Sequence, residues 1–466
     1  MMVYREIILK VLVVLILVIS AGCGEAERDS AESSSAGFGK NRAESAELAR
    51  SEYLHAWDGY KTYAWGNDDL KPLSKSFHNW YEEPLLMSAV DALDGLVMMG
   101  LTDEADLARE YIAENLSFDK DITVKNFEIT IRLLGGLLSS YQLTGDERLL
   151  GLAHDLGRRL LPVFDSPTGM PYMYVNLKTG ETSGAVSNPA EMGTLTLEFG
   201  ALSGLTGDPV FFEKAKAGVA ALYERRSPIG LVGTAIDVET GEWKDTGSHI
   251  SGRIDSYYEY LLKSWRLFGD EDFKRMYDTH IAAVNRYLAV EAESGFWYGW
   301  VDMNTGERLH PWFGALDAFM PAVLALSGDI ERAEKLQASC FAMWNLHGIE
   351  PEMIDFEKME VVEGGEAYHL RPEIIESAYY LYHFTGDPAY VEMGMKIFDD
   401  LRAWCRTEAG YAALGSVITK EKVDSMESFL FGETLKYLYL LFAEDGGRYL
   451  DEAVFTTEAH PLRRTW

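Results

Sequence analysis

The feature of this sequence that most constrains its fold is a Gly-Asp turn that recurs about every sixty residues. The turn occurs at Gly145, Gly207, Gly269, Gly328 and Gly386. Each turn follows a segment that is apolar on nearly every face, such as TLTLEFGALSGLTGD, and precedes an amphipathic one, such as DFKRMYDTHIAAVNRYL. A helix that is apolar all round must be buried, and an amphipathic helix can cover it. The pattern therefore predicts a repeated pair of one inner and one outer helix.

Looser versions of the hairpin occur at Gly100 and Gly446, which raises the count to seven pairs over the 466 residues. This period is longer than that of common open helical solenoids, and seven pairs fill the chain. We therefore expect an all-α (α/α)7 barrel, a closed toroid of inner helices ringed by outer helices. An open superhelix is the alternative architecture.

The N-terminus reads as a signal peptide over residues 1–22. Arg5 and Lys10 precede the apolar run VLVVLILVIS, which is too short for a membrane span, and small residues then lead to Cys23. This order resembles the bacterial lipoprotein cleavage box, although Ser20 stands where that box more often has an aliphatic residue. We expect a lipid on Cys23 and an extracytoplasmic protein anchored to a bacterial membrane. A plain signal peptide and an uncleaved anchor are the alternatives.

Residues 23–46 are rich in Ser, Gly and acidic residues, with little to bury, and predict a flexible tether before a catalytic domain at residues 47–466. Beyond Cys23 only Cys340 and Cys405 remain, so the sequence predicts neither a disulfide framework nor a cysteine metal site. The net charge of −32 repels phosphate backbones and anionic lipids, which argues against nucleic acid as a partner and favours a neutral ligand.

Four acids occupy the same phase of the repeat. Glu128, Asp255, Glu373 and Glu433 each precede their hairpin glycine by about three to four helical turns. If the inner helices of a toroid run in the same direction, these positions meet at one mouth of the barrel. We therefore expect carboxylates from different repeats to converge on one ligand, although a single glutamate at a helix start can also be only a partner for the helix dipole.

Glu373 follows Pro372, a residue suited to a helix start, so backbone N–H groups should favour its charged form. We expect a low pKa for Glu373, as suits a base. Glu128 lies in an apolar helix, where burial would raise its pKa and suit it to be an acid, but Arg132 one turn later opposes that shift. For Glu259 and Glu376, bridging neighbouring helices is the structural alternative to a functional role.

The C-terminal segment VFTTEAHPL places Thr457, Glu458 and His460 in an otherwise apolar tail that should return to the barrel. We expect His460 to pack or form hydrogen bonds inside the protein in preference to binding a metal.

Eight stretches occur in the order found in one known family: YKTYAWGNDDLKPLS, VDALDGLVMMG, FEITIRLLGGLLSSY, GTLTLEFGALSGLTGD, DSYYEYLLKSW, LRPEIIES, ETLKYLYLLF and TTEAHP. From about residue 52 to 462 the chain resembles glycoside hydrolase family 47, the class I α-1,2-mannosidases and the ER degradation-enhancing α-mannosidase-like proteins. The resemblance implies an (α/α)7 barrel, in agreement with the repeat count, and Ca²⁺-dependent, inverting, exo-acting mannosidase activity.

The resemblance also implies roles for individual residues. Glu128 matches the general acid, Glu373 the general base, and Asp255 a further catalytic carboxylate. The residues that match the sugar pocket of the family are Arg132, Arg253, Glu376, Phe429, Glu433 and Glu458. Thr457 matches the residue that holds calcium through hydroxyl and carbonyl oxygens, a donor set that suits this hard cation.

The chain departs from the mannosidases of the family at the segment ALDAF. Ala315 replaces a pocket histidine, and Ala318 replaces the disulfide partner of Cys340. The ER degradation-type branch shares this loss, and LVGTAIDVETGEW and GYAAL also resemble that branch, so the linkage preference is open.

We compared three functions with the sequence. We expect an α-mannosidase that removes terminal α-1,2-linked mannose from N-glycan or mannan chains, acting as a monomer on oligosaccharides or glycoproteins. The alternative is a mannose-binding, lectin-like module with little or no turnover. A helical scaffold for protein partners would leave the convergent acids unexplained.

Overall fold

The computed structural model describes residue 39 and residues 41–466. The predicted signal peptide, Cys23 and most of the predicted tether lie outside the described residues. Within the described part, no helix is both long enough and apolar enough to cross a membrane.

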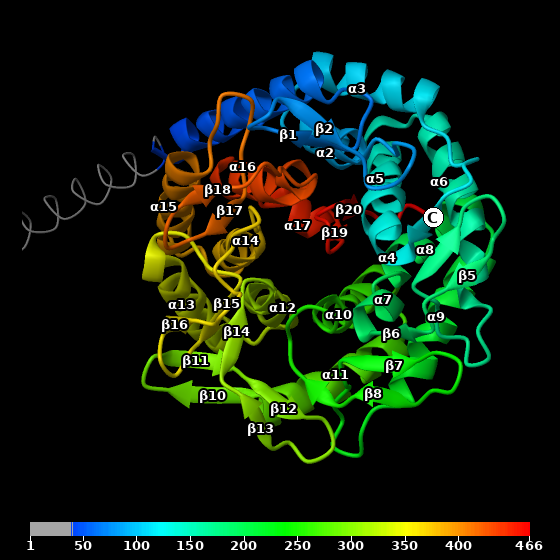
Figure 1. The fold of residues 1–466 in the computed structure, drawn as a ribbon, viewed down its shortest axis with the longest axis vertical. Helices are drawn as coiled ribbons and strands as arrows, with labels where there is room; N and C mark the ends of the chain where they lie inside the picture. The colour runs from blue at the N-terminus through cyan, green and yellow to red at the C-terminus, as the bar shows by residue number, and fades with distance from the viewer. Residues whose placement is uncertain (1–38, 40) are drawn as a thin grey trace, which may run out of the picture.

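Seven inner segments surround the centre of the molecule in a closed ring (Figure 1). In chain order they are α2 (Met87–Met98); α4 (Asn126–Ile129), the π-helical turn η1 (Thr130–Leu134) and α5 (Gly135–Thr144); α7 (Pro189–Gly193) and α8 (Thr196–Thr206); α10 (Asp255–Phe268); η3 (Leu316–Phe319) and α12 (Met320–Ser327); α14 (Glu373–Thr385); and the π-helical turn η4 (Leu430–Thr434) with α16 (Leu435–Phe442). Neighbouring segments pack together, and η4 packs against α2, so the ring is closed as an (α/α)7 barrel and the open superhelix is excluded.

Six outer helices follow their inner partners and pack against them. They are α3 (Thr102–Asn115), α6 (Glu147–Leu160), α9 (Val210–Tyr223), α11 (Glu271–Tyr287), α13 (Ile330–His347) and α15 (Ala389–Trp404), with a short 3-10 turn, η2 (Leu161–Phe164), after α6. The repeated glycine terminates the inner helix in five of these pairs: Gly145, Gly207, Gly269, Gly328 and Gly386 all have φ between 70° and 94°. Glycine adopts this left-handed conformation without a steric penalty, which explains the repeated turn signal.

The seventh outer helix is not where the sequence predicted it. After α16, the segment around Gly446 forms only α17 (Arg448–Glu452). Instead residues 41–63 form a long helix that covers the last inner segment and closes the ring between α15 and α3 (Figure 1). Arg42 donates hydrogen bonds to the carbonyl oxygens of Leu441 and Ala443 at 3.2 and 2.6 Å. Residues 41–46, which we placed in the tether, are therefore the first turns of this helix.

Aromatic side chains fasten this N-terminal helix to the barrel. The rings of Tyr53, Trp57 and Tyr60 all meet Phe431 of η4, with centroids 5.3, 5.8 and 6.5 Å apart. Trp57 is fully buried. The two ends of the folded chain are thus joined through one aromatic cluster.

Short strands occupy the connections from each outer helix to the next inner helix. They are β1 (Asp69–Lys71), β2 (Ser76–His78), β3 (Thr123–Lys125), β4 (Tyr174–Asn176), β5 (Thr182–Ser183), β6 (Val186–Ser187), β7 (Ala235–Asp237), β8 (Trp243–Asp245), β9 (Gly247–Ser248), β10 (Ala289–Ala292), β11 (Gly295–Tyr298), β12 (Trp300–Asp302), β13 (Arg308–His310), β14 (Trp312–Gly314), β15 (Met353–Asp355), β16 (Glu360–Val361), β17 (Leu414–Ser416) and β18 (Glu421–Lys422). They pair in antiparallel ribbons of two or three strands. The inner helices begin at these ribbons, so the predicted acids start from the same face of the barrel.

The C-terminal tail returns to the centre of the barrel, as predicted. Its strands β19 (Val454–Phe455) and β20 (Pro461–Leu462) form a hairpin that contacts α10 and α5 (Figure 1). Thr456, Glu458, Ala459 and His460 in the loop of this hairpin are buried. The tail therefore fills the lumen that seven inner helices would otherwise leave open.

The aromatic cluster generates a prediction about stability. Trp57→Ala should lower the free energy of unfolding by about 3–5 kcal/mol, because it opens a cavity between the N-terminal helix and Phe431. Trp404→Ala, at a tryptophan that is 39% exposed, is the control and should change it by about 0.5 kcal/mol or less. Urea denaturation of both variants measures the difference, and equal effects would contradict the closing role of this helix.

Candidate active site

A cavity of about 470 Å³ opens at the strand face of the barrel. All the residues proposed from the sequence line it: Glu128, Arg132, Arg253, Asp255, Glu373, Glu376, Phe429, Glu433, Thr457 and Glu458. Its wall also includes Glu259, for which the sequence left a bridging role as the alternative, and Lys125, Glu191 and Arg371, which the sequence analysis did not single out. Below the cavity, the C-terminal hairpin and the side chains packed around it fill the lumen. The cavity is therefore a blind pocket whose walls come from several inner helices.

Glu128 is held by two cations on the rim side of this pocket. It lies in α4, and its Oε1 is 3.4 Å from Lys125 Nζ, while Arg132 Nε donates to its Oε2 at 3.2 Å. Lys125 also contacts Glu191 at 2.9 Å, so a second carboxylate shares its charge. Arg132 lies in the π-helical turn η1, a distortion that is common at functional sites. These contacts fix the direction of the Glu128 carboxyl group.

Glu373 differs from the prediction in its protonation. It is the first residue of α14, as Pro372 led us to expect, but burial raises its pKa to about 8 in spite of the nearby Arg371. Arg371 makes two hydrogen bonds to Glu352, at 3.0 and 2.9 Å, so its charge is shared. The predicted low pKa is therefore wrong, because burial outweighs the helix start. Glu373 Oε2 has no hydrogen-bond partner among the described residues.

The other pocket carboxyls experience the same burial. Asp255 begins α10 and has a pKa raised to about 7, although Ser256 N–H donates to it at 2.8 Å. Burial also raises the pKa of Glu376, Glu433 and Glu458. The pocket therefore holds more acidic groups than its own cations can neutralise.

Glu259 and Glu376 both line the pocket, and Glu376 also bridges helices. Lys263 of α10 forms an ion pair with Glu259 and lies 3.8 Å from Glu376 of α14. The Tyr437 hydroxyl of α16 donates to Glu376 Oε1 at 3.1 Å. The bridging role that the sequence left as an alternative is thus found for Glu376, together with a position in the pocket wall, whereas the ion pair of Glu259 stays within α10.

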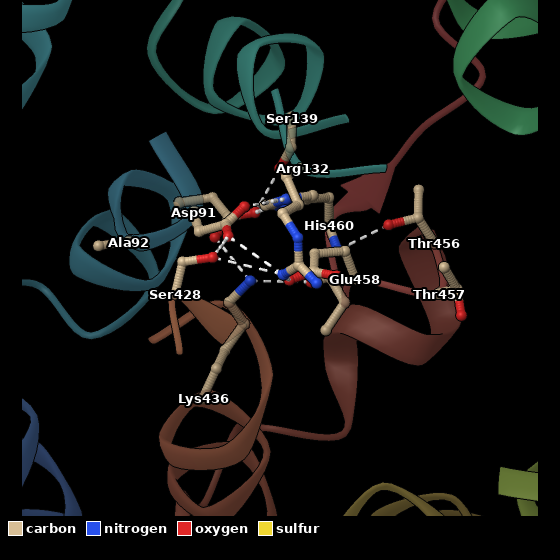
Figure 2. A network of polar contacts seen from close by, with 12 residues as sticks. Asp91, Ala92, Arg132, Ser139, Ser428, Lys436, Thr456, Thr457, Glu458 and His460 are labelled. Carbon is tan, nitrogen blue, oxygen red and sulfur yellow. Dashed lines mark hydrogen bonds and ion pairs between the residues drawn. The ribbon is translucent and has the colours of Figure 1, made fainter. Parts of the chain in front are cut away.

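A buried polar network supports the pocket floor (Figure 2). Arg132 Nη1 pairs with Glu458, lies 3.6 Å from Asp91 Oδ2 and donates to Ser428 Oγ at 3.3 Å. Ser428 in turn donates to Asp91. Arg132 therefore joins α2, the start of the last inner segment and the C-terminal hairpin.

A second layer of the network contains His460. Its Nδ1 is 2.7 Å from Asp94 Oδ2 and its Nε2 is 3.4 Å from Asp91 Oδ1. Lys436 Nζ lies 2.6 Å from Asp94 Oδ1 and donates to the Ala459 carbonyl at 2.9 Å. Burial opposes the charge of His460, but the two aspartates outweigh it and raise its pKa to about 9. Burial likewise opposes the charge of Asp94, but Lys436 and His460 bring its pKa below the ordinary value. The predicted hydrogen-bonding role of His460 is confirmed.

The sequence analysis missed the partners in this network, although a signal was present. Asp91 and Asp94 stand three residues apart in VDALDGLVMMG, a helix otherwise too apolar to face water. Two acids on a buried helix require cationic partners nearby. Lys436, in the apolar segment ETLKYLYLLF, carries the complementary signal.

The residues around Thr457 fit a hard cation. Thr457 lines the pocket at the hairpin loop, and its N–H donates to the Tyr260 hydroxyl at 3.2 Å, which leaves its own hydroxyl and carbonyl oxygens for other ligands. In the described residues no three His, Cys, Asp or Glu side chains are grouped as metal ligands. A cation here would therefore be held by the oxygens of Thr457 and by water or sugar hydroxyls ordered by nearby carboxylates.

The segment that departs from the family is buried. Ala315 and Ala318 are fully covered, and neither lines the pocket, whereas Leu316 and Phe319 do. Cys340 and Cys405 are buried free thiols.

An (α/α)7 barrel with a blind, carboxylate-lined pocket is the architecture of a carbohydrate-active enzyme. The profile of glycosyl hydrolase family 47 matches residues 52–464. The chain belongs to this family.

Relatives support this assignment over most of the chain. Alpha-mannosidase I MNS5 of Arabidopsis thaliana is 37% identical over 90% of this chain and 76% of its own length. The endoplasmic reticulum mannosyl-oligosaccharide 1,2-alpha-mannosidase of Homo sapiens is 38% identical over 88% of this chain and 62% of its own length. The solved structure of the alpha-1,2-mannosidase from Trichoderma reesei is 28% identical and superposes with a TM-score of 0.83, over 90% of this chain and 98% of that one.

The buried network generates a prediction about stability. Lys436→Met should lower the free energy of unfolding by about 3–5 kcal/mol, because it leaves a buried aspartate short of a partner. The control is Lys214→Met, which removes a surface pair with Asp165 (side chains 42% and 68% exposed) and should cost about 0–1 kcal/mol. Urea denaturation compares the two, and a loss as small as that of the control would show that the network does not hold the barrel together.

Proposed function

We propose that this protein is an exo-acting, inverting, Ca²⁺-dependent α-mannosidase that removes terminal α-1,2-linked mannose from N-glycan or mannan oligosaccharides. The observation that carries the proposal is the blind pocket, where carboxyls from different inner helices surround a space of sugar size. A pocket closed at its base admits only the end of a chain, which supports exo action.

The proposed mechanism uses two carboxyl groups on opposite faces of the sugar. Glu128 as the acid gives its proton to the leaving glycosidic oxygen while the bond to the anomeric carbon breaks. Glu373 as the base takes a proton from the water that attacks that carbon from the other side. Asp255, next along the wall, is the further carboxylate that helps to orient this water. Glu373 Oε2 has no hydrogen-bond partner among the described residues, which leaves it open to this water. Because burial raises the pKa of Glu373 to about 8, it acts as the base only in its ionised form, which a nearby cation would favour.

The remaining pocket residues would bind the terminal sugar. Arg132, Arg253, Glu376, Glu433 and Glu458 present charged hydrogen-bonding groups to its hydroxyls. Phe429 offers an apolar ring, which Arg132 and Arg371 flank at 5.6 and 5.7 Å from its centroid. Such a mixture of aromatic surface and several polar groups is typical of small-ligand sites.

Calcium is the proposed cofactor, with Thr457 as its protein ligand. When bound, it would supply a hard cation that fixes two hydroxyls of the sugar. The surplus of buried acids supports a cation here, since it would offset their mutual repulsion.

The relatives support mannose as the sugar, because several carry mannosyl-oligosaccharide 1,2-alpha-mannosidase in their names. Ala315, in place of the histidine, favours the ER degradation-enhancing branch. The identities do not separate the branches, since they are 36% to the ER degradation-enhancing alpha-mannosidase-like protein 2 of Mus musculus and 38% to the endoplasmic reticulum mannosyl-oligosaccharide 1,2-alpha-mannosidase of Homo sapiens. The leader-like sequence through Cys23 supports a lipid-anchored, extracytoplasmic bacterial location.

The acid and base assignments predict different kinetic defects. Glu373→Gln should lower kcat by about 10² to 10⁴-fold on every substrate, because the attacking water loses its base. Glu128→Gln should be similarly slow on α-1,2-mannobiose but recover much of the rate on an aryl mannoside whose leaving group needs no proton. If the aryl mannoside restores the rate only in the Glu373 variant, the acid and base roles of the two residues are the reverse of those proposed. A lectin-like module would show no turnover even in the wild-type protein.

Calcium binding should stabilise the protein more at high pH than at low pH. The pKa values of Glu373 and Asp255 are raised, to about 8 and 7. Without metal, the contribution of these two groups to the free energy of unfolding is therefore complete below about pH 4 and is lost as pH rises through 8. The melting temperature in EDTA should therefore fall between pH 5.5 and 8. Because calcium competes with these protons, its addition should raise the melting temperature more at pH 8. No shift at either pH, with full activity in EDTA, would remove calcium from the proposal.

A further inference from the structure

A second hollow of about 370 Å³ lies beside the proposed catalytic pocket. None of its lining residues lines the catalytic pocket; they are Trp80, Tyr81, Glu82, Asp121, Ile122, Thr123 and Asn176. They supply an indole, a phenol, two carboxylates, a hydroxyl, an amide and one aliphatic side chain. This combination offers both apolar ring surface and hydrogen-bonding groups.

One strand pair connects the hollow to the catalytic pocket. In the antiparallel pair of β3 and β4, Thr123 faces Asn176 at one end and Lys125 faces Tyr174 at the other. The intervening pair, Val124 and Val175, is buried. Since side chains alternate along a strand, the two end pairs share the outer face of the ribbon. The first pair lines the hollow and the second lines the catalytic pocket, about 7 Å further along the strands.

The hollow lies on the side of the pocket where the leaving group must depart. The Tyr81 hydroxyl accepts a hydrogen bond from the Lys125 N–H at 3.1 Å, and Lys125 Nζ is 3.4 Å from Glu128 Oε1. Glu128 is the proposed acid, which by its role faces the leaving oxygen. The rest of the oligosaccharide therefore leaves the pocket toward Lys125 and the strand pair.

Trp80 is fixed before any ligand binds. Its indole N–H donates to Asp69 and its backbone N–H donates to Asp68 Oδ2 at 3.0 Å. The Arg132 guanidinium lies 5.2 Å from the centre of its ring, so the indole stands between the hollow and the pocket. A ring that is already held in place loses little entropy on binding a sugar.

We propose that this hollow, the Trp80 subsite, binds the part of an α-mannooligosaccharide that extends beyond the two sugars joined by the scissile bond. The proposal rests on the function proposed above and adds a preference for longer chains. Trp80 would stack on one sugar face, and Asp121 and Asn176 would accept or donate hydrogen bonds to its hydroxyls.

The test compares a disaccharide with a longer chain. Trp80→Leu and Asp121→Ala should each lower kcat/KM for linear α-mannotetraose about tenfold, mainly through KM. The same variants should change kcat/KM for α-1,2-mannobiose by about twofold or less, because a disaccharide does not reach the hollow. Trp404→Leu, an exposed tryptophan on the outer helix α15, is the matched control and should affect neither substrate.

Two results would overturn the Trp80 subsite. The first is an unchanged kcat/KM for mannotetraose in both variants. The second is an equal loss on both substrates in Trp80→Leu with no effect of Asp121→Ala, which would mean that Trp80 acts only through Arg132. If the wild-type protein hydrolyses neither sugar, the proposed function fails, and calorimetric binding of mannotetraose then decides the subsite. Weaker binding in both variants supports it, and unchanged binding overturns it.

Discussion

The structure depends on how buried charge is neutralised at the centre of the barrel. Seven inner helices enclose a lumen too wide to be filled by their own side chains, and the C-terminal hairpin enters it carrying Glu458 and His460. Arg132 pairs with Glu458 (Figure 2), and Asp94 lies between Lys436 and His460. Ions this deeply buried are tolerated only when each is paired, so the network fixes where the hairpin stops. The position of the hairpin in turn sets the base of the pocket.

The same arrangement accounts for the electrostatics above it. Arg132 is already engaged below by Glu458 and Asp91, so little of its charge remains for the acids around the cavity. Lys263 is likewise paired with Glu259 in the wall, and Arg371 is paired with Glu352. Burial then raises the pKa values of Asp255 and Glu373. An added cation would reduce the repulsion between the carboxyl groups of this pocket. The pocket binds a neutral, hydroxyl-rich ligand with less repulsion than an anionic one.

Much of this could be predicted from the sequence because the signals are local. The glycine turns mark five inner helices, and the shared phase of Glu128, Asp255, Glu373 and Glu433 anticipates their convergence. The predictions that were wrong concern features that depend on contacts between distant segments. The helix of residues 41–63 closes the ring only because it packs on Phe431, near the other end of the chain, and its polar first turns resemble a linker. The pKa of Glu373 is decided by burial under several helices, which its position behind Pro372 does not reveal. The hollow at Trp80 arises from three separate segments and has no single sequence motif.

The central claim is that Glu128 and Glu373 act from opposite faces of a terminal mannose. The most direct measurement is proton NMR of the free mannose released from the methyl glycoside of α-1,2-mannobiose by the calcium-loaded protein, before the sugar mutarotates. We expect β-mannose, because water displaces the leaving group from the face opposite to it. Release of α-mannose would contradict the assignment of an acid and a base, and it would point to a carboxylate that attacks the sugar directly.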